Sequence, residues 1–205
     1  MTTALTKKSG KGITDGVISE LATVWDILPG REEEVRAATQ RMFKAIHNLD
    51  PATSAATGLR DARTVIFNGG RQLLFATTFE TEWDPYIDDA ILVVSVGAFL
   101  DWMQHTVQGQ EIVAWAKDSG ANKFAPGDPE WEALMKKATS RLKAILQSTQ
   151  SPATGYFNAV SALTLPQIDR AQRVNRAFDQ VLDDPAAAEA LQQPALKPLL
   201  ELAAD

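Results

Sequence analysis

The chain has 205 residues, of which 45% are hydrophobic and 22% are charged, and its net charge of −6 argues against a general affinity for nucleic acid. It contains no cysteine, which excludes disulfides, thiolate catalysis and thiolate-bound zinc or iron–sulfur clusters. The longest apolar stretch, Ala90 to Leu100, falls well short of the ~20 residues that a membrane span needs, so we expect no membrane insertion. Because Met1 to Gly16 has no apolar core typical of a secretory signal, we expect a cytoplasmic protein.

The first elements predicted are a disordered tail, a strand and a helix. Residues 1–17 are rich in Ser, Thr and Gly, a composition that favours disorder. Leu21 to Leu28 contains the β-favouring residues of a strand. Pro29-Gly30 ends this strand, and apolar residues then recur every three or four positions up to Leu49, as on one face of a helix. Asp50-Pro51 stops this helix, and we expect a Thr/Ser/Ala loop after it.

A β-hairpin is the clearest local pattern. Leu59 to Phe67 alternates, so that Leu59, Asp61, Arg63, Val65 and Phe67 are expected to share one face. Asn68-Gly69-Gly70 follows, and these residues tolerate the positive φ angles of a tight turn. Arg71 to Phe79 is the return strand.

The middle of the chain predicts helices. Asp84 before Pro85 is typical of a helix N-cap, and the helix is expected to continue through Leu100 with a bend at Gly97. Further helices are predicted at Gln110 to Lys117 and at Pro129 to Gln150. Residues 93–150 therefore form a predicted helical insertion.

The last part of the chain predicts one more strand and a helical extension. Thr154 to Leu163 is the strand candidate, and Thr164 is expected to cap the first of several C-terminal helices covering about 164–204. The resulting order, β-α-β-β-α-β, is that of a ferredoxin-like unit. We expect an α+β fold in which residues 18–205 form a single domain.

Two segments resemble a known superfamily. WDILPGREEEVRAA (25–38) is similar to the first strand and helix of the dimeric α/β-barrel superfamily. GLRDARTVIFNGGRQLLFATTFETEWDPYIDD (58–89) resembles the hairpin and the start of the second helix in a branch that is partly described as peroxidase-related. The resemblance implies a homodimer in which two sheets pack face to face into a barrel. Members include cofactor-free monooxygenases, haem-dependent peroxidases and proteins without a known reaction, so the fold alone does not choose among them.

His105 is the candidate catalytic residue and haem ligand that follows from this resemblance. It is one of only two histidines in the chain, and imidazole is a common axial ligand of haem iron. Asp101 precedes His105 by one helical turn, and we expect its carboxylate to hydrogen-bond the imidazole ring and fix its tautomer. The alternative is a partly exposed histidine near a helix end.

Arg60, Asp61 and Arg63 are candidate polar residues of a ligand pocket on the hairpin. An arginine there would hold an anionic group or act as the distal residue of a peroxidase site, with Asp61 beside it. The alternative interpretation is a cross-strand ion pair.

Aromatic residues near the second helix complete the candidate pocket. Trp83, Tyr86 and Trp102 are expected either to border a cavity for a small apolar or aromatic ligand or to pack in the core or an interface. The acidic residues from Glu80 to Asp89 match no metal-binding motif and are interpreted as a solvated helix start, so no metal site is predicted.

Two classes of function remain open from the sequence. The first is a small-molecule-binding dimeric α/β-barrel protein, with a haem-dependent peroxidase-like or a cofactor-free monooxygenase-like oxidoreductase as its enzymatic versions. In this class the pocket is expected between sheet and helices, with Ala90 to Leu100 as one wall. The second is a non-enzymatic assembly or interaction protein that uses the Ala/Pro-rich C-terminal helices.

Overall fold

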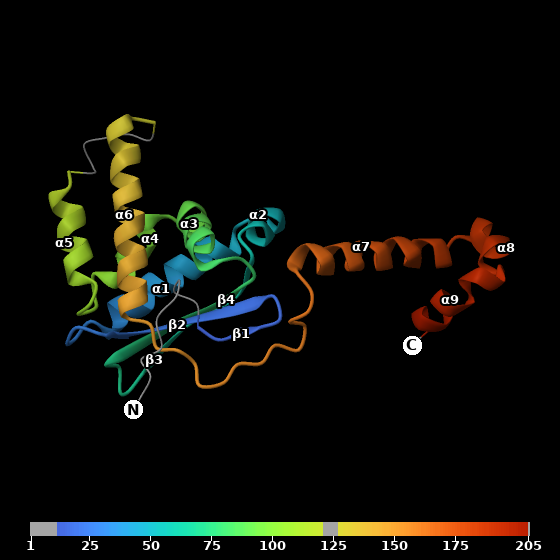
Figure 1. Ribbon diagram of the computed structural model, residues 1–205, viewed down its shortest axis with the longest axis horizontal. Helices are drawn as coiled ribbons and strands as arrows, with labels where there is room; N and C mark the ends of the chain where they lie inside the picture. Colours follow the sequence, from blue (N-terminus) through green and yellow to red (C-terminus); the bar gives the residue numbers. More distant parts are fainter. Residues whose placement is uncertain (1–11, 121–126, 205) are drawn as a thin grey trace, which may run out of the picture. The chain divides into compact units, whose positions relative to one another are not determined.

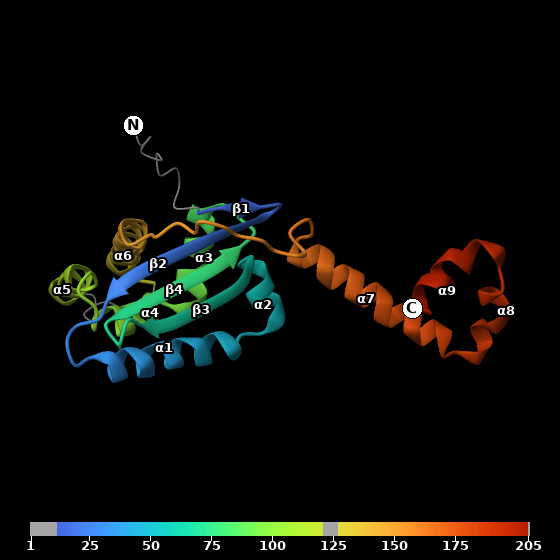
Figure 2. The same ribbon diagram turned by 90° about the horizontal axis from the view of Figure 1, so that it is seen from below.

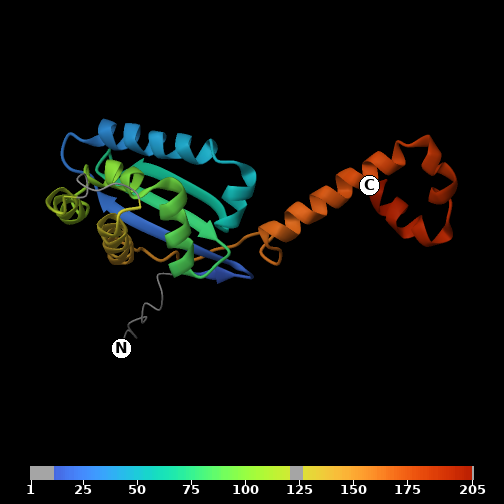
Figure 3. The same ribbon diagram turned by 90° about the horizontal axis from the view of Figure 1, so that it is seen from above.

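The computed structural model describes residues 12–120 and 127–204. Contacts along the chain divide it into two units, Met1–Ala162 and Leu163–Asp205. The first unit is an α+β structure in which helices pack on one face of a four-stranded antiparallel sheet (Figures 1 and 3). Among the described helices, none has both the length and the apolar character needed to cross a membrane.

The sheet has the strand order β1-β2-β4-β3, and its hairpin confirms the sequence prediction. Asn68, Gly69 and Gly70 form the turn with φ angles of 53°, 64° and 82°. The first long strand begins three residues earlier than predicted, because Ser19 and Glu20 pair with the end of the returning strand at Phe79 and Thr78. The strands are β1 (Thr14–Asp15), β2 (Ile18–Asp26), β3 (Leu59–Phe67) and β4 (Gln72–Phe79).

The predicted strand from Thr154 to Leu163 is wrong, because the structure assigns no strand to these residues. The chain instead runs beside β2 without a continuous ladder (Figure 2). The N–H of Val24 donates to the carbonyl of Thr149 (3.0 Å), and the N–H of Ser151 donates to that of Ala22 (2.8 Å). Pro152 follows at once, and its lack of an N–H interrupts further pairing. The fourth strand is the short β1, which lies in a segment predicted to be disordered.

Helices after β2 follow the prediction in part. The helix expected after Gly30 is confirmed, but the expected loop after Asp50 is a short helix. Proline is favoured at the first helical position, and the Asp50 carboxylate accepts the N–H of Thr53 at 2.9 Å. Pro51 therefore begins a helix instead of only ending one. These helices are α1 (Glu32–His47) and α2 (Pro51–Ala56).

The single helix predicted after Asp84 is two helices, which meet at Ser95 and not at Gly97. Ser95 has a φ of 79°, outside the helical region, and its hydroxyl accepts the N–H of Ala98 at 3.2 Å. Ser95 thus ends one helix and caps the next. The predicted insertion helices are confirmed, and the helices of this region are α3 (Trp83–Val94), α4 (Val96–Met103), α5 (Gln110–Asp118) and α6 (Pro129–Ser148).

The second unit consists of helices, as predicted for about 164–204. Its longest helix is capped by Thr164, whose N–H donates to the side chain of Gln167 at 2.8 Å. None of its helices, as far as the chain is described, contains a buried residue. The elements are α7 (Leu165–Leu182), η2 (Pro185–Ala187), α8 (Ala188–Leu191), η3 (Pro194–Leu196) and α9 (Lys197–Ala203).

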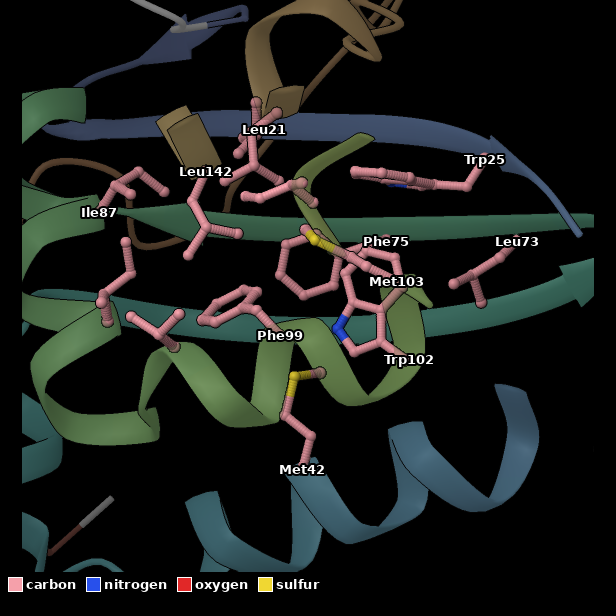
Figure 4. Close-up of a cluster of buried hydrophobic side chains, with 14 of the residues drawn as sticks. Leu21, Trp25, Met42, Leu73, Phe75, Ile87, Phe99, Trp102, Met103 and Leu142 are labelled. Carbon is pink, nitrogen blue, oxygen red and sulfur yellow. The ribbon is translucent and has the colours of Figure 1, made fainter. Parts of the chain in front are cut away.

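The core lies between the sheet and the helices of the first unit, and large aromatic side chains fill it (Figure 4). Trp102 of α4 meets Trp25 of β2 edge to face, with ring centroids 4.8 Å apart, and stacks on Phe75 of β4 at 6.0 Å. Leu142 of α6 is fully buried in the same cluster. The helical insertion is therefore part of the core and not a separate appendage.

Replacing Leu142 with alanine tests this view of the insertion. Because the side chain has no exposure, we expect the free energy of unfolding to fall by about 2–5 kcal/mol in urea denaturation. The control is Leu92→Ala, since Leu92 is 81% exposed and its loss is expected to change stability by less than about 0.5 kcal/mol. Equal effects of the two changes would contradict the assignment of α6 to the core.

Candidate functional site

The candidate site is the face of the sheet opposite the helices. Leu21, Trp25, Leu73 and Phe75 point toward the helices (Figure 4), so the residues that alternate with them point the other way. In the first unit, as far as it is described, no helix covers this side (Figure 2). We call it the open face, and its residues are Glu20, Ala22, Val24 and Asp26 of β2, Asp61, Arg63, Val65 and Phe67 of β3, and Gln72, Leu74, Ala76 and Thr78 of β4.

An apolar row crosses the open face. Strand pairing places Val24 beside Leu74, and Leu74 beside Val65. Val65 is 44% exposed, and Phe67 at the next position on this face of β3 is 39% exposed. An antiparallel sheet with one solvated face normally has polar residues there. The apolar row is therefore unusual for a face without a covering helix, and it makes the open face the candidate site.

Asp61 and Arg63 lie together on the open face. The Arg63 guanidinium is 3.3 Å from the Asp61 carboxylate, which also accepts a hydrogen bond from the Thr78 hydroxyl of the neighbouring strand. Both side chains are about half exposed. Their predicted shared face is thus correct, but this face is turned away from the helices, where the sequence analysis placed the pocket.

Leu59 departs from the predicted alternation. Its partner across the ladder is Phe79, whereas Asp61 pairs with Thr78, so Arg60 is an extra residue in β3. Such a bulge changes which side the residues before it face. Arg60 is consequently not on the exposed part of the strand. Its guanidinium contacts the Glu80 carboxylate at 2.5 Å, with the two side chains only 9% and 8% exposed.

A polar network lies at the end of the open face that is farther from Asp61 and Arg63. The Asp26 carboxylate accepts hydrogen bonds from the side-chain amides of Gln72 (3.1 Å) and Gln108 (2.8 Å). The Gln108 side chain in turn accepts the N–H of Asp26 at 2.9 Å. Charged or polar groups therefore lie at both ends, with the apolar row between them.

Trp83, Tyr86 and Trp102 lie in the core on the helix side and not with Asp61 and Arg63. They are 1%, 3% and 0% exposed, which matches the alternative of core packing. The Tyr86 hydroxyl shares a hydrogen bond with that of Thr77 at 2.6 Å, and burial raises the pKa of Tyr86. The expected pocket between sheet and helices is filled by these rings and by Ile91 and Phe99.

His105 follows α4 in a turn next to the start of α1. Asp101 does not orient its ring, because the Asp101 carboxylate binds the Arg41 guanidinium at 2.7 Å. The charged groups around His105 are Arg31, Glu34, Asp101 and Arg41. A haem slot requires an apolar cavity beside the ligand, whereas the side chains around His105 are charged. These surroundings do not fit a haem.

The acidic residues at the start of α3 are held by a lysine. Asp84 and Asp88 contact the Lys143 ammonium of α6 at 3.0 and 2.8 Å. Over the described residues, no group of three or more His, Asp or Glu side chains is arranged to hold a metal ion. This pair of contacts ties α3 to α6.

Comparisons with family models, curated proteins and solved structures found no match to this chain. The functional assignment therefore depends on the geometry of the open face.

The sequence analysis did not identify Val24 and Leu74 as site residues. The available signal was the composition of their strands, which have apolar residues on both faces. In β2, Leu21 and Trp25 lie on one face, and Ala22 and Val24 lie on the other. A strand with apolar residues on both faces is typically buried on both faces. That pattern predicts a covering layer on each side of the sheet.

The pKa of His105 provides a test of its surroundings. Burial and the nearby Arg31 lower this pKa below the ordinary value of 6.5, because both disfavour the charged ring. The unfolded chain then takes up the proton more readily than the folded one, so stability is fully present above pH 6.5 and declines as the pH falls through the lower folded pKa.

We expect His105→Gln to reduce this loss of stability between pH 8 and pH 5.5, measured by urea unfolding. A folded-state pKa of His105 at or above 6.5, measured by NMR titration, would contradict the account.

Proposed function

We propose that the chain is a homodimeric α/β-barrel protein that binds a small molecule between two open faces. The observation that carries the proposal is the apolar row of half-buried Val24 and Leu74 and exposed Val65 on a sheet whose other face is already packed. The adjacency of β2, β4 and β3, with helices on one side, is compatible with a ferredoxin-like unit. A second copy provides a surface of the same shape and polarity.

Face-to-face packing of two copies would bury the apolar side chains of the open face. Packed sheets lie about 10 Å apart and bury the apolar side chains of both inner faces. A twofold arrangement uses the same surface on each copy, so the apolar rows of two copies contact each other. The charged residues Asp61 and Arg63 then lie beside this apolar contact, where they are less hydrated than in the single chain.

The ligand proposed is a small apolar or aromatic molecule with a polar group. Ala76 adjoins Arg63 on the open face and Ala22 adjoins Ala76, and both have shorter side chains than the neighbouring row of Val24 and Leu74. Arg63 provides a cation and Asp61 a carboxylate at the same place. Of the two oxidoreductase versions, the cofactor-free one suits these residues better, because they require no metal or haem to hold the ligand.

Replacing Val65 with glutamate is expected to convert the dimer into a monomer. The change puts a carboxylate into the proposed apolar contact, where its burial without a partner costs several kcal/mol. Light scattering after size-exclusion chromatography measures the mass, and circular dichroism verifies that the variant is folded.

Leu92→Glu is the matched control, since Leu92 is 81% exposed on α3 and the variant should remain dimeric. A monomeric wild-type protein at concentrations up to about 100 μM would overturn the proposed dimer.

A non-enzymatic assembly function is the second candidate, and the C-terminal unit favours it. Apolar residues of α7 recur on one side of the helix and remain exposed, with Val174 60% and Val181 42% accessible. Folded units of this size usually bury an apolar core of their own. A helix with an uncovered apolar face is suited to bind a groove on another protein.

Val174→Ser with Phe178→Ser is expected to abolish binding of a defined protein partner while leaving dimer formation unchanged. Quantitative cross-linking mass spectrometry in native extract compares the variant with wild type and with Arg173→Ser on the opposite side of α7. Equal cross-linking of all three proteins through α7 would contradict this role.

A further inference from the structure

A groove runs between α5 and α6, away from the open face. It consists of two adjoining hollows of about 420 and 780 Å³ that share Arg141 and Ala144. The two helices stand side by side in the first unit (Figure 1). Volumes of ~300–1,000 Å³ are typical of small-molecule sites. The two hollows fall within or near this range, but both are open to solvent, so a molecule bound here would lie in a shallow surface groove.

The larger hollow is basic although the chain as a whole is acidic. Lys136, Lys137, Ser140 and Arg141 of α6 border it, together with Trp115 of α5. None of the described residues that line it is acidic. Among the residues that the structure describes, Lys136 and Lys137 form no ion pair, whereas Lys143 on another side of α6 is held between two carboxylates. The two lysines are therefore available to an external anion.

Arg141 and Trp115 form a fixed pair at the middle of the groove. The guanidinium lies 4.9 Å from the centre of the Trp115 ring. Its carboxylate neighbour, Glu111, is 3.7 Å away and 89% exposed, a contact that contributes little in water. The aromatic ring thus orients the arginine, and within residues 12–120 and 127–204 its guanidinium has no closer charged partner than Glu111.

We infer that the α5–α6 groove binds a small phosphorylated aromatic molecule. Lys136, Lys137 and Arg141 would contact its phosphate groups, and the ring would pack on Trp115. Several close cations suit an anion with more than one negative charge, and arginine suits phosphate because its planar fork matches two phosphate oxygens. A tryptophan at the same place suits a flat ring, because stacking on aromatic side chains favours any such ring.

This site is independent of the proposed dimer, because none of its residues lies on the open face.

The test uses the full chain and a nucleoside triphosphate, ATP, as the probe in isothermal titration calorimetry at low salt. We expect saturable binding of one ATP per chain that weakens as salt is raised. The double variant Lys136→Gln/Lys137→Gln should weaken it at least about tenfold, since it removes two charge-assisted contacts. Both lysines are exposed, so the fold is expected to tolerate the change.

A matched control removes the same charge elsewhere. Lys44→Gln/Lys197→Gln changes two exposed lysines of α1 and α9 and should leave the affinity within about twofold of wild type. Trp115→Leu should weaken ATP binding more than it weakens the binding of inorganic tripolyphosphate, because it removes the ring contact with ATP in addition to the side chain that orients Arg141.

Three results would overturn the inference. The first is the absence of saturable ATP binding up to about 1 mM, and the second is an equal loss of affinity in both lysine double variants. The third is tripolyphosphate or a short single-stranded oligonucleotide binding more tightly than ATP, because either outcome assigns the groove to another class of ligand. The Val65→Glu variant is expected to bind ATP normally, so failure of the dimer proposal is distinguishable from failure of this one.

Discussion

The contact of Trp102 with Trp25 and Phe75 is the interaction on which the rest of the first unit depends. It fixes α4 against the centre of the sheet, and α1, α3 and α6 pack around the same cluster. Because this contact collects the covering helices on one side, no described helix of the unit covers the opposite face of the sheet (Figure 2). The apolar row on that face, Val24, Leu74 and Val65, therefore lies outside the core that the helices cover.

The same packing explains why the candidate pocket is not between sheet and helices. The buried rings fill that space, so Trp83, Tyr86 and Trp102 act in stability and not as an accessible lining. Polar residues with room around them occur in two other places, the open face with Asp61 and Arg63 and the α5–α6 groove with Lys136 and Lys137. Each place has a different chemistry: the first is an apolar surface with one exposed ion pair, and the second is a basic groove with an aromatic ring.

Local patterns predicted the elements that depend on neighbouring residues. The hairpin follows from Asn68-Gly69-Gly70, and α1 follows from its apolar spacing, since both signals are contained in a few adjacent residues. The fourth strand was missed because strand pairing depends on distant partners: Pro152 stops the ladder beside β2, and the short β1 takes its place. Alternation correctly grouped Asp61 with Arg63, but a period of two does not say which face the helices cover. The Arg60 bulge and the Lys143 contacts also depend on tertiary packing.

Burial of the open face between two copies is the central claim, and the cysteine-free chain allows a direct measurement. A single thiol introduced as Val65→Cys can be labelled with a maleimide at several protein concentrations, with Leu92→Cys as the reference. The account predicts that labelling at position 65 slows as the concentration rises through the range of dimer formation, while labelling at position 92 stays constant. Rates at position 65 that are fast and independent of concentration would contradict it.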